Sequence, residues 1–151
     1  MSKIPAYRSR KDYDQALDRF KGAIELDHAN PEYYYNLGLA YYYLEKPEQE
    51  ESAYMQVLGI ESDDPDLNPI LAKTYLNLAC LYAQQGKKDQ AFNQLEKLLT
   101  IAPATLYDNI SDKDLDSLRD DPRYKRLLAK KPISSSESGE ATTSGISGKP
   151  E

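Results

Sequence analysis

The sequence offers few of the side chains that bind metals or form disulfides. It contains one cysteine, Cys80, and one histidine, His28. A single cysteine excludes both an internal disulfide and a cysteine-rich zinc site. Since His28 lies far from Cys80 along the chain, no nucleophile and base of the triad type can be assigned. We therefore predict no metal, no cofactor and no catalytic residues.

Long apolar runs and a surplus of basic charge are also missing. Nowhere do about 18 apolar residues follow one another, so no membrane-spanning helix is expected. Residues 1–20 lack the apolar stretch of a signal peptide, and we expect a cytoplasmic, reducing environment. The 25 acidic residues outnumber the 19 Lys and Arg, for a net charge of -6. This balance argues against a nucleic-acid-binding surface.

What the sequence does contain is helical periodicity with clear ends. Apolar side chains such as Tyr13, Leu17 and Phe20 recur at helical spacing. Two Asn-Pro pairs combine an N-cap with a proline in the first turn, and Gly86 is suited to a left-handed helix end. The predicted helices span residues 12–26, 31–44, 47–60, 68–85 and 88–100. No segment shows strand-like alternation, so we predict an all-α fold.

Equivalent residues recur at a fixed period. Phe20 and Tyr54 are 34 residues apart, and Tyr34 and Tyr75 are 41 apart, which is 34 plus an insertion of seven. Helices of about 14 residues joined by short turns must lie antiparallel to their neighbours. One hairpin buries a single face, whereas stacked hairpins bury a continuous core. The period therefore predicts an α-solenoid of antiparallel helical hairpins.

The recurring residues resemble the motif of the tetratricopeptide repeat (TPR) family, roughly W-x2-L-G-x2-Y-x8-A-x3-F-x2-A-x4-P. The third copy carries Tyr75, Leu78, Ala79, Tyr82, Ala91, Leu95, Leu98 and Pro103 at the family's spacings. The second carries Tyr34, Leu37, Gly38, Tyr41, Tyr54 and Val57. It departs from the motif at Glu50, where the family has a small Ala at the helix crossing, and at Ser62, where Pro is usual.

The first copy is only half a repeat, in which Ala16, Phe20 and Ala23 fit the second helix. The resemblance thus implies about two and a half TPR repeats over residues 11–103. Beyond them, residues 111–130 resemble two short capping helices. A solenoid needs such a cap because its last hairpin otherwise exposes an apolar face. The residues expected to cover that face are Leu115, Leu118, Tyr124, Leu127 and Leu128.

The predicted organisation has three parts. Residues 1–10 form an N-terminal arm, and residues 11–130 form the TPR-like helical domain. Residues 131–151 are rich in Ser and Gly and contain too few apolar side chains to offset the entropy of ordering, so a disordered tail is expected.

In the TPR family the first helix of each hairpin lines a concave face that binds peptides or proteins. The resemblance therefore implies a protein-protein interaction module or adaptor, with a protein or peptide as its partner. By spacing, the groove would be lined by Tyr35, Asn36, Leu39, Tyr42, Tyr43, Lys73, Leu76, Asn77, Cys80 and Gln84. We expect its occupant to be an extended peptide with apolar side chains or a partner helix.

Six tyrosines between residues 33 and 43 are the most informative feature of this groove. They lie on one helix and cannot all face a single core. Tyr is favoured at interfaces because it combines rigid apolar area with a hydroxyl, so a binding role is predicted. Packing beneath adjacent hairpins is the alternative. Cys80 is expected to be a small buried hydrophobe, with a redox-sensitive thiol as the other interpretation.

The sequence also predicts an alternative function at its N-terminal half-repeat. The half-repeat leaves a stripe of Leu17, Phe20 and Ile24 without the helix that precedes it in a full repeat, and an exposed apolar stripe usually marks an interface. It predicts, as the alternative function, a homodimer or docking on a larger complex.

A chaperone-tail clamp is not expected. One TPR subtype holds a chaperone tail through a two-carboxylate clamp of Lys, Arg and Asn side chains. Asn36 and Lys73 match two of those positions, but Asn77 stands where the Arg would be and the first repeat lacks its lining helix. The charge-assisted hydrogen bonds to a carboxylate would then rest on one Lys.

Overall fold

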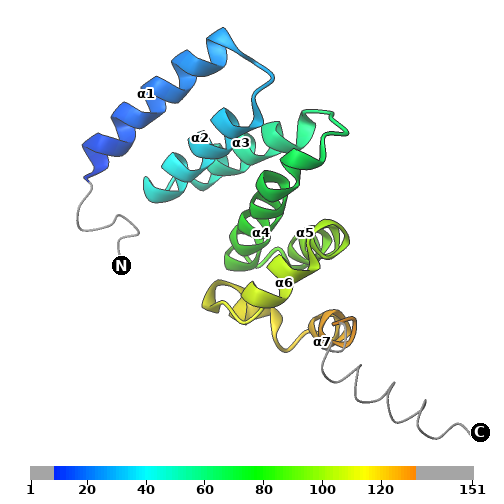
Figure 1. Cartoon of the computed structure of the whole chain (residues 1–151). Helices are drawn as coiled ribbons and strands as arrows, with labels where there is room; N and C mark the ends of the chain where they lie inside the picture. The colour runs from blue at the N-terminus through cyan, green and yellow to red at the C-terminus, as the bar shows by residue number, and fades with distance from the viewer. Residues whose placement is uncertain (1–8, 132–151) are drawn as a thin grey trace, which may run out of the picture.

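The computed structural model describes residues 9–131, and within that range it is built from helices without a strand (Figure 1). In chain order the elements are α1 (Arg10–Leu26), α2 (Pro31–Tyr43), α3 (Pro47–Gly59), η1 (Pro65–Leu67), α4 (Asn68–Gln84), α5 (Lys88–Ile101), α6 (Pro103–Asn109), η2 (Lys113–Leu118) and α7 (Pro122–Ala129). The predicted all-α fold is confirmed. Most of the predicted arm and tail lies outside the described residues.

Local capping interactions set the helix ends. The Ser9 side chain accepts a hydrogen bond from the Asp12 N–H (3.3 Å), and the Asp12 carboxylate accepts one from the Ser9 N–H (2.9 Å). This capping box starts α1 two residues before the predicted position. Asn30 caps α2 by accepting from the Glu32 N–H at 3.0 Å, as the Asn-Pro pair predicted. Gly86, with φ 75°, ends α4 in the predicted left-handed conformation.

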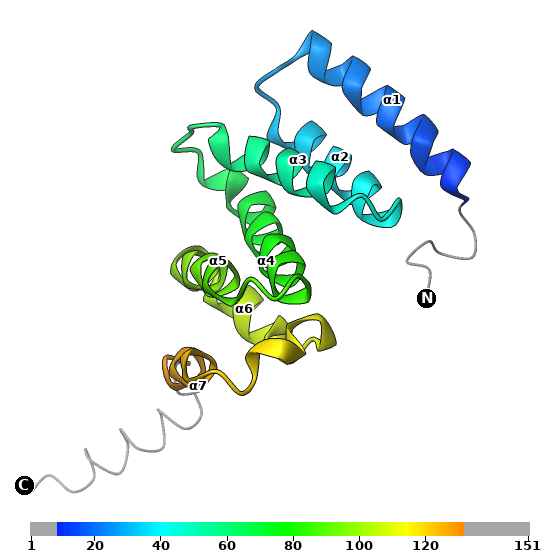
Figure 2. The ribbon, with the colours of Figure 1, turned by 180° about the vertical axis from the view of Figure 1, so that it is seen from behind.

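Consecutive helices pair as antiparallel hairpins. α2 packs on α3, α4 packs on α5, and α1 lies against α2. Figures 1 and 2 show these pairs rotated relative to one another, so that the chain forms a short curved array. Where α2 crosses α3, Gly38 faces the buried ring of Tyr54. A Cβ at position 38 would lie no more than 3.0 Å from three carbons of that ring, so only glycine permits this approach.

Two apolar clusters form the interior. The larger one extends from α3 to α7 and includes the predicted repeat positions Leu78 and Leu95, which are fully buried. The smaller one joins α1 to α2 and contains Tyr13, Leu17, Ala40 and Leu44. Leu17 is only 6% exposed, so the predicted open stripe on α1 is wrong at this residue. The reason is that α2 covers the face of α1 that carries it, whereas Phe20 and Ile24 stay half-buried.

The capping segment differs from the prediction in two ways. The predicted helices include none between residues 100 and 111, because a proline such as Pro103 commonly follows a helix end. In the structure Pro103 is instead the first residue of α6, where a missing N–H costs nothing. Leu128 does not cover the last hairpin and is 41% exposed. It follows Leu127 on α7, and neighbouring helical residues point in different directions. The other four predicted capping residues, Leu115, Leu118, Tyr124 and Leu127, are buried.

The Arg123 side chain of α7 contacts two residues of α5. Its guanidinium donates to the carboxylates of Asp121 (2.8 Å) and Asp89 (2.7 Å) and lies 4.5 Å from the centre of the Phe92 ring. Such a planar cation can use its edge for carboxylates and its face for an aromatic ring. The hydrogen bonds from Arg123 hold the pKa of Asp121 well below its ordinary value.

Candidate partner-binding groove

The first helices of the two complete repeats, α2 and α4, line an open cavity of about 320 Å³ that the segment from α6 to η2 closes on another side. Eight of the ten predicted groove residues line it: Tyr35, Leu39, Tyr42, Tyr43, Leu76, Asn77, Cys80 and Gln84. The other two, Asn36 and Lys73, line an adjoining cavity of about 360 Å³ that shares Tyr35. We call the two cavities together the groove. The structure therefore brings the predicted residues together along α2 and α4.

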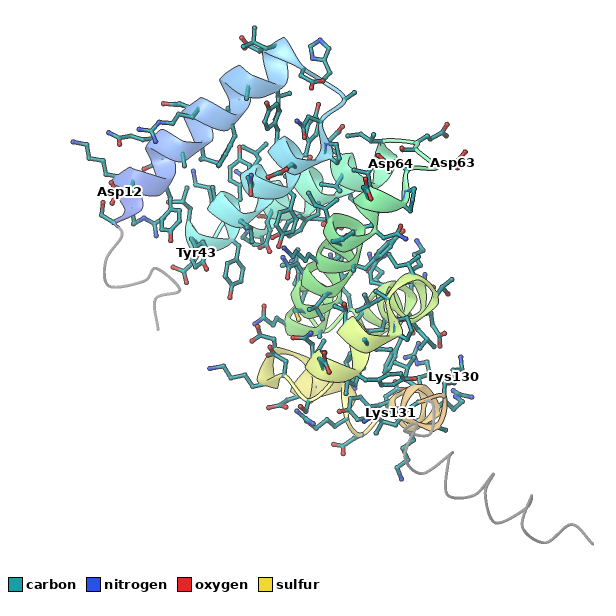
Figure 3. All side chains as sticks on the ribbon, in the orientation of Figure 1. Asp12, Tyr43, Asp63, Asp64, Lys130 and Lys131 are labelled. Carbon is teal, nitrogen blue, oxygen red and sulfur yellow. The ribbon has the colours of Figure 1, made fainter. Side chains whose placement is uncertain are left out.

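Three tyrosines of α2, Tyr35, Tyr42 and Tyr43, take part in packing and also line the groove. Tyr43 stacks on Tyr13 of α1 with ring centres 4.8 Å apart, near the start of α1 where Asp12 lies (Figure 3). Tyr42 meets Tyr43 edge-on at 5.1 Å. All of these α2 rings are half-buried. These contacts fix the ring orientations, which agrees with the packing interpretation, while the binding interpretation stays a prediction.

Asn77 has a structural role inside the groove. Its amide donates to the hydroxyls of Tyr35 (3.3 Å) and Tyr54 (3.2 Å), which joins α2, α3 and α4. The donor that stands at the position of the clamp Arg is thus already engaged. Lys73 lies in the adjoining cavity together with two carboxyl side chains, Glu32 and Asp66. Carboxyl groups at that place repel a carboxylate ligand, which agrees with the expectation that no chaperone-tail clamp is present.

Three carboxyl side chains line the 320 Å³ cavity and were missed by the sequence analysis: Glu50, Asp112 and Asp114. Asp114 accepts a hydrogen bond from the Gln84 amide (3.1 Å), and Asp112 accepts one from the Asp114 N–H (2.8 Å). Glu50 is only 3% exposed. Its departure from the TPR motif was a visible signal for this site. No such signal marked the two aspartates, since they reach the cavity only because the capping segment folds back against α4.

The environment of Cys80 favours the packing interpretation of this residue. It is half-buried, and burial, followed by the nearby carboxyl groups of Asp114, Asp112 and Glu50, raises the pKa of the thiol to about 12. Because the thiolate is the reactive form, a thiol with so high a pKa is a poor redox sensor. Burial and then Asp114 also raise the pKa of Tyr42. The raised pKa values of Cys80 and Tyr42 thus reflect burial first and the carboxyl groups around the cavity second.

Neither a metal centre nor a membrane span is found in the part of the chain that the structure describes. Within residues 9–131 no group of three or more His, Cys, Asp and Glu side chains could hold a metal ion. No helix in the same range is long and apolar enough to cross a bilayer.

Asp63 and Asp64 lie in the loop between α3 and α4 at the outer edge of the molecule (Figure 3). Asp64 caps η1 by accepting from the Asp66 N–H at 2.9 Å, which is a turn role.

Comparison with known families agrees with this architecture. A family model described as TPR repeat matches residues 6–44, and one described as tetratricopeptide repeat matches residues 31–64 and 72–105. The chain belongs to the tetratricopeptide repeat family. The two 34-residue matches begin at or near the α2–α3 and α4–α5 hairpins, so the resemblance inferred from residue spacing is confirmed. As an array of TPR hairpins, the chain is a protein-interaction module.

A solved structure and two curated relatives place the similarity in the repeats. TTC0263, a thermophilic TPR protein of Thermus thermophilus, is 27% identical and superposes with a TM-score of 0.53, over 83% of this chain and 54% of that one. BBSome complex member BBS4 of Xenopus tropicalis is 33% identical over 90 residues, 60% of this chain and 16% of that protein. Small glutamine-rich tetratricopeptide repeat-containing protein 2 of Saccharomyces cerevisiae is 40% identical over 63 residues, 42% of this chain and 18% of that protein. The chain thus spans less than a fifth of either curated relative.

Proposed function

We propose that this TPR module acts as an adaptor that binds a segment of a partner protein, extended or helical, in the groove between α2, α4 and η2. The observation that supports this best is a run of aromatic and aliphatic side chains from two repeats along one open channel. Tyr35, Leu39, Tyr42 and Leu76 are all half-buried there. Rigid, partly exposed rings beside aliphatic side chains are the surface that protein interfaces favour. We expect no chemistry in the groove, only recognition.

Tyr42→Ala is the sharpest test of this proposal. Tyr35 is less suitable because its hydroxyl accepts from Asn77, so its removal would also disturb the fold. Tyr33→Ala provides a matched control, since Tyr33 is a half-buried tyrosine of the same helix that lines neither cavity. Loss of an interface tyrosine should weaken partner binding by at least about 1 kcal/mol, or about fivefold.

The measurement is capture of partners from the native cell by the tagged chain, followed by titration of each purified partner. Helix content by circular dichroism should be the same for all three proteins. Partners that bind the wild type and Tyr33→Ala with equal affinity but bind Tyr42→Ala more weakly support the groove as the binding site. Equal affinity for all three proteins would argue that binding takes place elsewhere.

A second candidate role is self-association, or docking on a larger complex, through α1. Leu26 at the end of α1 is 91% exposed, and Phe20 and Ile24 are half-buried on the same helix. Leu17 is excluded from this surface because it is buried. Sedimentation at micromolar concentration tests self-association. A dimer that is lost in Leu26→Ser supports it, and a strict monomer of the wild type removes it.

A further inference from the structure

The carboxyl groups along the groove indicate which chemistry its occupant must have. The lining of the two cavities contains Glu50, Asp112 and Asp114 in one, and Glu32 and Asp66 in the other. Among the described residues, Lys73 is the one cationic side chain in either lining. Five carboxyl groups against one ammonium group give the channel a negative potential. A groove with charge of one sign raises the local concentration of ligands of the other sign.

The two aspartates of the η2 end keep this charge available to a ligand. Within residues 9–131, none of the ion pairs includes Asp112 or Asp114. The bond that Asp114 accepts from Gln84 comes from a neutral amide, which leaves its charge in place. Lys113, which lies between the two in sequence, is exposed and pairs with neither.

Glu50 adds a carboxyl group that the TPR motif lacks. It stands at the helix crossing where the TPR motif has a small Ala, and it lines the cavity while only 3% of it is exposed. A carboxyl oxygen at this place can accept a hydrogen bond from the ammonium or guanidinium group of a ligand. The ring of Tyr42 lines the same cavity, and an aromatic ring can attract Lys or Arg.

We infer that the groove takes a segment of a partner protein in which Lys or Arg side chains stand among apolar ones. The basic side chain occupies the cavity between Tyr42 and Asp114, and the apolar side chains lie along Leu39 and Leu76. This inference rests on the proposed function, that the groove binds a partner segment, and adds the charge of that segment. A partner segment rich in carboxylates would meet carboxyl groups along most of the channel and is selected against.

Two synthetic peptides test the inference with the full chain. One is a labelled peptide of leucine and lysine, and the other is identical except that each lysine is replaced by glutamate. Binding is followed by fluorescence anisotropy. The lysine peptide should bind at least about tenfold more tightly at low salt, and the difference should shrink as salt screens the charges.

Variants of the groove acids identify the responsible groups. Asp114→Asn keeps the acceptor for Gln84 and removes only the charge, and Glu50→Ala restores the residue that the family carries. Each substitution should lower the affinity for the lysine peptide by about three- to tenfold while helix content is unchanged. Asp108→Asn is the matched control, because Asp108 is an exposed carboxyl group on α6 outside both linings. It should leave the affinity unchanged.

Two results would overturn the inference. The first is equal or tighter binding of the glutamate peptide, and the second is full affinity of the lysine peptide for Asp114→Asn. The proposed function is judged separately by Tyr42→Ala and the captured partners. A groove that binds partners through Tyr42 but ignores peptide charge therefore refutes only the inference.

Discussion

Replacing Gly38 by alanine tests the close approach of α2 and α3 on which the second hairpin depends. The new Cβ would lie no more than 3.0 Å from three ring carbons of Tyr54, whereas carbon atoms pack favourably at about 3.5–4.0 Å. The ring has no free space beside it, since Tyr54 is 0% exposed and its hydroxyl accepts from Asn77 at 3.2 Å. Either the ring or one of the helices must therefore shift.

The expected magnitude follows from two opposing effects. Alanine is favoured over glycine inside a helix by about 0.5–1 kcal/mol. Forcing an additional methyl group into a packed site costs about 1–3 kcal/mol. Because the second effect is the larger, Gly38→Ala should lower the free energy of unfolding by about 0.5–2 kcal/mol.

Gly22→Ala in α1 provides a control of opposite sign. A Cβ there meets nothing within 4 Å, so only helix propensity acts and the free energy of unfolding should rise by about 0.5–1 kcal/mol. Urea unfolding followed by far-UV circular dichroism measures both variants, with linear extrapolation to water. If Gly38→Ala proved as stable as the wild type or more so, the hairpin would be looser than the structure shows, and the reasoning would be refuted.

Three further predictions use polar groups of the groove and the cap. Asn77→Ala should lower the free energy of unfolding by about 1–2 kcal/mol in urea unfolding, because two tyrosine hydroxyls lose their donor. At about pH 8, iodoacetamide should alkylate Cys80 at least ~100-fold more slowly than a free thiol, as measured by timed mass spectrometry, because a pKa of about 12 leaves little thiolate. Below about pH 4, the hydrogen-exchange protection factors of the α7 amides, which correct for the intrinsic exchange rate at each pH, should fall. The lowered pKa of Asp121 means that its stabilisation is fully present above the ordinary value of 3.8 and is lost as the falling pH protonates the carboxylate and breaks its pair with Arg123.

Each of these has a control within the same chain. Tyr54→Phe removes one acceptor of Asn77. The double variant Asn77→Ala with Tyr54→Phe should therefore lose less free energy of unfolding than the sum of the two single variants. Cys80 should react at the rate of a free thiol once the protein is unfolded in urea. Asp121→Asn should remove the acid sensitivity of α7. If the two stability losses simply added, the hydrogen bond between Asn77 and Tyr54 would be contradicted. A fast reaction of the folded protein would contradict the raised pKa of Cys80. Acid sensitivity that persists in Asp121→Asn would show that another group causes it.

Most helix ends could be predicted from the sequence because the forces that set them are local. A side chain that caps its own helix, as Asn30 does, acts within a few residues of itself. Gly86 adopts a left-handed conformation that its own lack of a Cβ permits. Pro103 shows the limit of this reasoning. A proline is compatible both with the end of one helix and with the first turn of another, and the structure uses it for the second.

The predicted groove residues lie together because the repeat period fixes which positions of successive hairpins are equivalent. Residues at equivalent positions of α2 and α4 must line the same face when hairpins stack with a constant rotation. The stripe on α1 was misjudged at Leu17 because the face that a helix buries depends on which neighbour reaches it, and α2 reaches this one. The aspartates of the η2 end carry no periodicity that could have linked them to the groove.

The sequence by itself determined the family, the helices α1 to α5 and the groove residues of α2 and α4, because capping, helical spacing and a 34-residue period depend on short stretches of chain. Only the tertiary structure decided the charge of the groove, the depth of Glu50 within it and the engagement of Asn77 by two tyrosines. These properties depend on how α3 and the capping segment pack against α4, with atoms from distant parts of the chain brought within a few ångströms of one another. Contacts of this kind leave no local pattern to be read in advance.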